Sequence, residues 1–166
     1  ILMIEFVSFK DSNKIHTIHP YPAKFPPSIP NQIIRKLAKS GQTILDPFCG
    51  CGTTLTEGLL NNCNVIGNDI NFIGLLISHI KTTMYYENDL KKVEDIMLDI
   101  SNNFEQKIQI KNPTHFKGIE HWFQNNVVYE LDLIKTSIID QPEKIKNLIK
   151  LIISCILIEV SNQESD

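Results

Sequence analysis

The residues best suited to chemistry form one short run, which reads Asp46-Pro47-Phe48-Cys49-Gly50-Cys51-Gly52-Thr53-Thr54. Glycines at a strand-to-helix turn let the backbone approach a ligand closely, and the first turn of the following helix offers unpaired N–H groups. The run departs from a dinucleotide fingerprint, because Leu55 stands where a third glycine or alanine is expected, and it lacks the lysine of a phosphate-binding loop. The pattern therefore indicates a ligand-binding turn that is not built for phosphates.

Two carboxylates frame this turn. Asp46 would repel a pyrophosphate but attract an amino group or a sulfonium, and Asp69, seventeen residues after Gly52, stands where an acid can accept hydrogen bonds from both hydroxyls of a ribose. Together they indicate an adenosyl ligand that is cationic and carries no phosphate, for which S-adenosylmethionine (AdoMet) is the candidate. A nicotinamide-dinucleotide (NAD) domain is an alternative, against which Leu55 and Asp46 argue.

The elements that must hold these residues can be read on either side of the turn. Residues 43–45 are a short apolar run typical of a buried parallel strand, and residues 53–60 read as a helix. Residues 65–67 predict a second strand, after which Asn71 is placed to cap another helix. Strand, glycine turn, helix, strand and acid form the opening βαβ unit of a nucleotide-binding α/β sheet.

A proline-rich segment precedes this unit. We call residues 19–27 the strap, because four prolines in eight positions fix φ and favour an extended, semi-rigid chain. Ser28 and Pro30 then predict the start of a helix that ends at Gly41.

From residue 88 onward the pattern is helical alone, with apolar side chains at helical spacing in residues 90–104, 127–138 and 145–160. We therefore expect two domains, residues 1–87 and residues 88–166. A loop is predicted over residues 111–121, next to the cluster His121-Trp122-Phe123. These side chains could stack on a base, although an aromatic cluster beside a loop more often ties the loop to the core.

Composition places the chain among globular proteins. It has 166 residues, 42% hydrophobic and 21% charged, with a formal net charge of −3, which excludes disordered and collagen-like classes. Only one basic residue, Arg35, is an arginine, so no global basic field of a nucleic-acid-binding protein is present. The first forty residues are nevertheless basic, with six basic and two acidic side chains, and also contain His16 and His19.

The cysteines and the apolar stretches indicate the cellular compartment in which the protein is expected. The four cysteines have no zinc-site spacing, so no metal is expected, and with no signal peptide they suggest reduced thiols in a cytoplasmic protein. The most apolar stretch, residues 151–158, is far shorter than a membrane span and predicts a buried helix.

The run from Asp46 to Thr54 resembles the AdoMet-binding signature Asp-Pro-Phe-x-Gly-x-Gly-Thr-Thr of the amino-methylating DNA methyltransferases, and every fixed position matches. These enzymes methylate the exocyclic N4 of cytosine or N6 of adenine. The strap is similar to the segment that closes over the methionine part of the cofactor in this family, and residues 65–71 resemble the strand that carries the ribose-binding acid. The resemblance spans about residues 16–82 and implies a partial Rossmann-like methyltransferase fold.

The resemblance also implies roles for individual residues. The backbone from Phe48 to Gly50 and the Thr53 hydroxyl would contact the methionine moiety, Asp46 its amino group, and Asp69 the ribose. Ile70 or Phe72 would pack on the adenine, while Lys24 and Phe25 would approach from the strap. The predicted cofactor-binding set is Lys24, Phe25, Asp46, Pro47, Phe48, Cys49, Gly50, Gly52, Thr53, Asp69, Ile70 and Phe72. Core packing is the alternative for the phenylalanines, and turn or cap chemistry is the alternative for the two acids.

The catalytic element of the family is missing from the sequence. That element is Ser, Asn or Asp followed by Pro-Pro-Tyr, whereas the one Pro-Pro pair here, Pro26-Pro27, belongs to the strap. We therefore predict no catalytic residues in this chain, and two strands are also fewer than the sheet of this family contains. The expectation is the AdoMet-binding N-terminal part of a restriction-modification DNA methyltransferase, truncated before the catalytic motif and inactive alone.

Its partners would be double-stranded DNA, met mainly by regions outside this chain, and either a complementary methyltransferase half or a second copy, with no membrane. The alternatives are a non-catalytic AdoMet-binding subunit and one half of a split enzyme.

Overall fold

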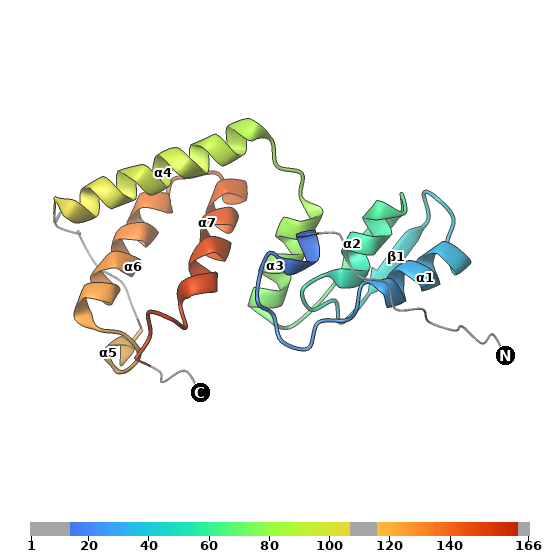
Figure 1. The fold of residues 1–166 in the computed structure, drawn as a ribbon, viewed down its shortest axis with the longest axis horizontal. Coiled ribbons are helices and arrows are strands. Elements are labelled where there is room, and N and C mark those ends of the chain that lie inside the picture. Colours follow the sequence, from blue (N-terminus) through green and yellow to red (C-terminus); the bar gives the residue numbers. More distant parts are fainter. Residues whose placement is uncertain (1–13, 107–115, 163–166) are drawn as a thin grey trace. The chain divides into compact units, whose positions relative to one another are not determined.

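The computed structural model describes residues 14–106 and 116–162 (Figure 1). The chain divides after Met84 into two compact units, a mixed α/β unit and a helical unit. Across the described residues, no helix combines the length and the apolar character that a membrane span requires.

The first unit is built around two parallel strands. Its elements in order are a 3-10 helix η1 (Lys14–Thr17), α1 (Ser28–Leu37), β1 (Thr43–Asp46), α2 (Thr53–Leu60), β2 (Asn64–Gly67) and α3 (Phe72–Thr82). The register of β1 and β2 runs from the pair Thr43 and Asn64 to the pair Asp46 and Gly67. Helix α2 packs on both strands and lies between α1 and α3 (Figure 1). The predicted order of strand, turn, helix, strand and capped helix is confirmed.

Two glycines let α2 lie close against the strands. A Cβ atom on Gly58 would come within 2.5 Å of Val65 Cγ1 and 3.3 Å of Ile44 Cδ1, and one on Gly67 would come within 2.4 Å of Leu55 Cδ1. Because real Cβ atoms do not approach so closely, any larger residue at either position would push helix and sheet apart. This close packing fixes the start of α2 beside the carboxyl end of β1.

Three sequence expectations need correction in this unit. The strap is not extended throughout, because Ala23 adopts a left-handed φ of 51°. Helix α1 ends at Leu37 and not at Gly41, which instead supplies a φ of 83° in the following turn. The strands are not buried on both faces, since Leu45 and Ile66 are 64% and 56% exposed. The reason is that α2 is the element that covers the sheet within the described part of the chain, and it covers one face.

The second unit is helical, as predicted. It contains α4 (Glu87–Glu105), α5 (Ile119–Trp122), α6 (Asn125–Ile138) and α7 (Glu143–Ile156), and α4 packs against both α6 and α7. Its core consists of aliphatic side chains from these three long helices, namely Val93, Ile96, Ile100, Leu133, Ile138, Ile145 and Ile149.

Two expectations for this unit are wrong in part. Residues 151–158 do not form one buried helix, because α7 ends at Ile156 and Ile158 is 69% exposed. The predicted loop over residues 111–121 contains the start of α5, while residues 111–115 lie outside the described ranges.

Candidate cofactor-binding site

The turn between β1 and α2 is shaped by glycine. Gly50 and Gly52 have φ values of 48° and 75°, in the left-handed region that glycine enters without steric cost. The amide of Gly52 donates to the Cys49 carbonyl at 2.8 Å, and the Thr56 hydroxyl donates to the Gly52 carbonyl at 2.9 Å. Gly52 is also the N-cap of α2. The turn is therefore a closed, hydrogen-bonded structure that leads directly into the helix.

Asp69 holds this turn from the neighbouring strand end. Its Oδ2 accepts a hydrogen bond from the Gly50 amide at 2.7 Å, and its Oδ1 accepts one from the Asn71 amide at 2.9 Å. Both bonds lower the pKa of the Asp69 carboxyl below its ordinary value, and the bond from the Asn71 amide contributes more than the bond from the Gly50 amide. Each carboxylate oxygen has a second lone pair, so the group retains acceptor capacity for a ligand.

Asp46 occupies the corresponding place at the end of β1. Its Oδ1 accepts a hydrogen bond from the Phe48 amide at 3.2 Å. Both carboxylates thus accept hydrogen bonds from backbone amides in the turns, which was the alternative role considered for them. That they also bind a ligand stays a prediction.

A pocket of 340 Å³ lies between the strap and the glycine turn. Tyr21, Ala23, Lys24 and Phe25 line it from the strap, and Asp46, Phe48, Cys49, Gly50, Cys51, Thr53 and Thr54 line it from the turn and the start of α2. The volume falls in the range of about 300–1,000 Å³ that small-molecule and cofactor sites occupy. The two segments that the sequence singled out therefore form one cavity.

Seven of the twelve predicted site residues line this pocket: Lys24, Phe25, Asp46, Phe48, Cys49, Gly50 and Thr53. The other five, Pro47, Gly52, Asp69, Ile70 and Phe72, do not line it. Asp69 reaches the pocket wall through the Gly50 amide. Ile70 and Phe72 are 95% and 86% exposed, and Phe48 is 85% exposed. Core packing, the alternative for the phenylalanines, is therefore wrong for Phe48 and Phe72, and also for Phe25, which is 51% exposed.

Charges of both signs stand in the pocket wall. The Nζ atom of Lys24 donates to the carbonyl oxygens of His16 at 3.2 Å and His19 at 3.3 Å. An ammonium has three hydrogens, so one remains for a ligand. With Asp46 also lining the pocket, the cavity offers a cation and a carboxylate to the same occupant.

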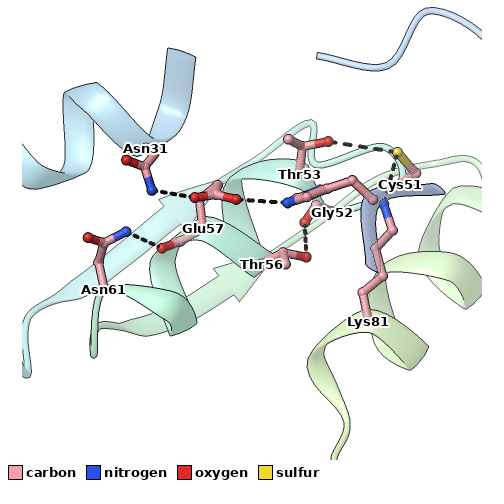
Figure 2. A network of polar contacts seen from close by, with 9 residues as sticks. Asn31, Cys51, Gly52, Thr53, Thr56, Glu57, Asn61 and Lys81 are labelled. Atoms are coloured by element: carbon pink, nitrogen blue, oxygen red, sulfur yellow. Dashed lines mark hydrogen bonds and ion pairs between the residues drawn. The ribbon is translucent and has the colours of Figure 1, made fainter. Parts of the chain in front are cut away.

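Four pocket residues were missed by sequence reasoning: Tyr21, Ala23, Cys51 and Thr54. Tyr21 lies between two prolines, and its phenol pKa is raised by burial and by the nearby charge of Asp69. Cys51 occupies the variable position between the two glycines. Its sulfur accepts a hydrogen bond from the buried Lys81 ammonium at 3.7 Å (Figure 2).

A buried polar network around Glu57 was also missed (Figure 2). The Glu57 Oε1 lies 2.7 Å from Nε2 of His16, and Oε2 accepts a hydrogen bond from Asn31 Nδ2 at 2.5 Å. The available signal was Glu57 itself, the one charged residue in a helix otherwise made of apolar, small and hydroxyl side chains.

Comparison with known proteins gives the family of the chain. Residues 4–72 match the model of a DNA methylase family. The chain is 36% identical over 102 residues to the type II methyltransferase M.MjaII of Methanocaldococcus jannaschii, covering 61% of this chain and 19% of that protein. It is 30% identical over 145 residues to M.MvaI of Kocuria varians, covering 81% and 32% of the two chains. It is 32% identical over 173 residues to M.BsoBI of Geobacillus stearothermophilus, covering 98% and 32%. No solved structure matches.

In the structure a glycine turn joins β1 to α2, Asp46 ends β1 and Asp69 follows β2, which is the arrangement that the sequence predicted. Together with the matched segment, it identifies the chain as a member of the amino-methylating DNA methylase family. The chain spans no more than a third of the length of these three relatives.

Proposed function

We propose that this chain is the AdoMet-binding part of a DNA methyltransferase that methylates the exocyclic amino nitrogen of cytosine or adenine in a restriction-modification system. Membership of the DNA methylase family supports the reaction class, and three relatives carry the name of type II methyltransferases. A partial Rossmann-like fold and a cytoplasmic location belong to the same proposal.

The observation that carries the proposal is the meeting of Asp46, Lys24 and the glycine turn in one pocket. The methionine end of AdoMet is an amino acid with an ammonium and a carboxylate. Asp46 would accept from the ammonium, and the remaining N–H of Lys24 would donate to the carboxylate. The same pair suits a phosphate-bearing dinucleotide less well, because Asp46 would repel it.

The adenosine end would lie toward the second strand. Asp69 would accept hydrogen bonds from the ribose hydroxyls through the lone pairs that the amides of Gly50 and Asn71 leave unused. Ile70 and Phe72 present exposed apolar surface beside it, against which an adenine would pack. When bound, AdoMet supplies an electrophilic methyl group, and the residues of this chain bind and orient it.

Binding of the methyl acceptor, the target base, requires residues other than those that bind AdoMet. A target base inside a duplex must leave the stack before its amino group can react, and the Pro-Pro-Tyr element that would hold it does not occur in this sequence. In the proposal, DNA contacts and the catalytic motif come mainly from residues outside this chain.

A non-catalytic AdoMet-binding subunit and one half of a split enzyme are the alternatives. Mixing the chain with a Pro-Pro-Tyr-bearing methyltransferase half distinguishes them, because a split enzyme gains methylation of DNA on mixing.

Isothermal titration calorimetry of the full chain with AdoMet tests the ligand. We expect saturable binding that Asp69→Ala weakens by about tenfold or more, since a hydrogen-bonding carboxylate would be lost. Asp95→Ala, which removes an exposed carboxylate on α4, is the matched control and should leave the affinity unchanged. A folded chain that binds NADH and not AdoMet would overturn the proposal.

A further inference from the structure

His16 and Glu57 are joined in the interior of the first unit, although 41 positions separate them in the sequence. Their side chains are 5% and 6% exposed, and the Nε2 to Oε1 distance is 2.7 Å. A carboxylate only accepts hydrogen bonds, so the imidazole N–H is the donor. Neither residue lines the pocket.

The Glu57 carboxylate connects three segments. Glu57 belongs to α2, and its Oε1 is hydrogen-bonded to His16 of η1. Its Oε2 is hydrogen-bonded to Asn31 of α1 (Figure 2). Burying a carboxylate is costly unless its oxygens are hydrogen-bonded, and here each oxygen has a partner. Removing one partner would leave a buried charge incompletely satisfied, so the three segments are held together at this point.

The main chain of His16 continues the connection to the pocket. Its carbonyl oxygen accepts one of the two hydrogen bonds that hold the Lys24 ammonium, and the His19 carbonyl accepts the other. Lys24 in turn lines the pocket next to Ala23 and Phe25. A continuous series of contacts therefore runs from Glu57 through His16 to Lys24.

We propose that His16 and Glu57 are positioning residues, which set ligand affinity by fixing the Lys24 ammonium in the pocket wall without touching the ligand. This inference rests on the proposed function, because AdoMet is the ligand whose carboxylate Lys24 would meet. If the His16–Glu57 pair is broken, the backbone around His16 loses its attachment to α2, and Lys24 loses one of its two carbonyl partners.

A double-mutant cycle on the full chain separates this role from a general contribution to stability. AdoMet affinity is measured by calorimetry for the wild type, His16→Ala, Lys24→Met and the double variant. We expect each single variant to weaken binding by about tenfold, and the double variant to bind no more weakly than Lys24→Met alone. Glu57→Gln, which keeps the size and one acceptor of Glu57, should weaken binding by less than His16→Ala.

Amide hydrogen exchange gives a second readout that needs no ligand. Exchange in residues 14–25 should accelerate in His16→Ala and in Glu57→Gln. The matched control is Ile34→Ala, which removes a buried side chain of α1 and lowers the stability of the same unit. It should leave the AdoMet affinity within about twofold of the wild type, because it leaves the contacts of Lys24 in place.

The outcomes separate the two proposals. Failure of the folded wild type to bind AdoMet overturns the proposed function and the ligand role of the pair together. Binding by the wild type with additive losses in the cycle overturns the positioning role and leaves the proposed function standing. The same holds if Lys24→Met does not change the affinity, or if exchange in residues 14–25 is equal in all variants.

Discussion

The amide of Gly50 donates a 2.7 Å hydrogen bond to Oδ2 of Asp69, so the acid predicted to bind a ribose also holds the glycine turn in its shape. The bond joins the two turns that follow the adjacent strands β1 and β2. In the proposed function Asp69 also binds the ribose, so a variant of Asp69 is expected to change both ligand affinity and local stability.

This coupling predicts a pH dependence of stability. The folded-state pKa of Asp69 is lowered by the Asn71 and Gly50 amides, so its contribution to stability is complete above the unfolded-state pKa of about 4 and is lost as the pH falls through the folded-state value. Below about pH 4 the melting temperature of the wild type should fall more steeply than that of Asp69→Asn. Thermal melts from pH 7 to pH 2.5, followed by circular dichroism, measure the difference. Equal slopes would show that the bonds to Asp69 do not persist in solution.

Gly74 provides a steric test of the contact between α3 and the glycine turn. A Cβ atom there would stand 2.9 Å from the Gly50 carbonyl oxygen and 3.1 Å from the Tyr21 hydroxyl. Because backbone cannot yield as a flexible side chain does, Gly74→Ala should cost about 1–3 kcal/mol of unfolding free energy and displace the turn. Denaturant melts measure the cost, and calorimetry measures the accompanying loss of AdoMet affinity.

The control for this variant is Gly118→Ala, in the helical unit. An added Cβ meets no atom within 4 Å there, but the residue has a φ of 88°. It should lower stability through backbone strain, by about 1 kcal/mol, and leave AdoMet binding unchanged. Equal effects of the two variants on affinity would contradict a specific role for the α3 contact.

The predicted division into two domains can be tested through Ile149. This side chain is fully buried in the core of the helical unit. Replacement by alanine removes buried methyl groups and should destabilise that unit by about 2–5 kcal/mol. If residues 1–87 form a domain of their own, AdoMet affinity at a temperature below both transitions should stay the same. A parallel loss of affinity and of helical-unit stability would show that the two parts fold as one.

Local signals in the sequence were sufficient for most of the first unit. Ser28 and Pro30 mark the start of α1, and Asn71 caps α3 through hydrogen bonds from the amides of Ile73 and Gly74. The turn motif is itself local, so its position between β1 and α2 was predictable. What could not be predicted depends on which segments meet in space.

The bond between His16 and Glu57 is an example, since no spacing rule relates residues 41 positions apart. Which face of each strand is buried was equally hard to predict from the sequence. A short apolar strand looks the same in sequence whether one face or both are covered, and Leu45 and Ile66 are exposed because α2 lies on the opposite face. The prediction of an extended strap was wrong at Ala23, because the prolines constrain their own φ angles and not that of a residue that follows a proline.

Cys49 offers a chemical probe of the pocket. Burial raises the pKa of its thiol above the ordinary value of 9.0, with smaller contributions from the charges of Asp46 and Asp69 in the same direction. The reactive thiolate is therefore scarce at pH 8, and iodoacetamide should label Cys49 more slowly than free cysteine, with the rate still rising above pH 9. AdoMet should slow the labelling further, since the residue lines the pocket.

Peptide mapping by mass spectrometry distinguishes Cys49 from Cys63. Cys63 does not line the pocket and should be labelled at the same rate with and without ligand. Equal protection of both cysteines would mean that AdoMet tightens the whole unit, and absence of protection at Cys49 would place the ligand elsewhere.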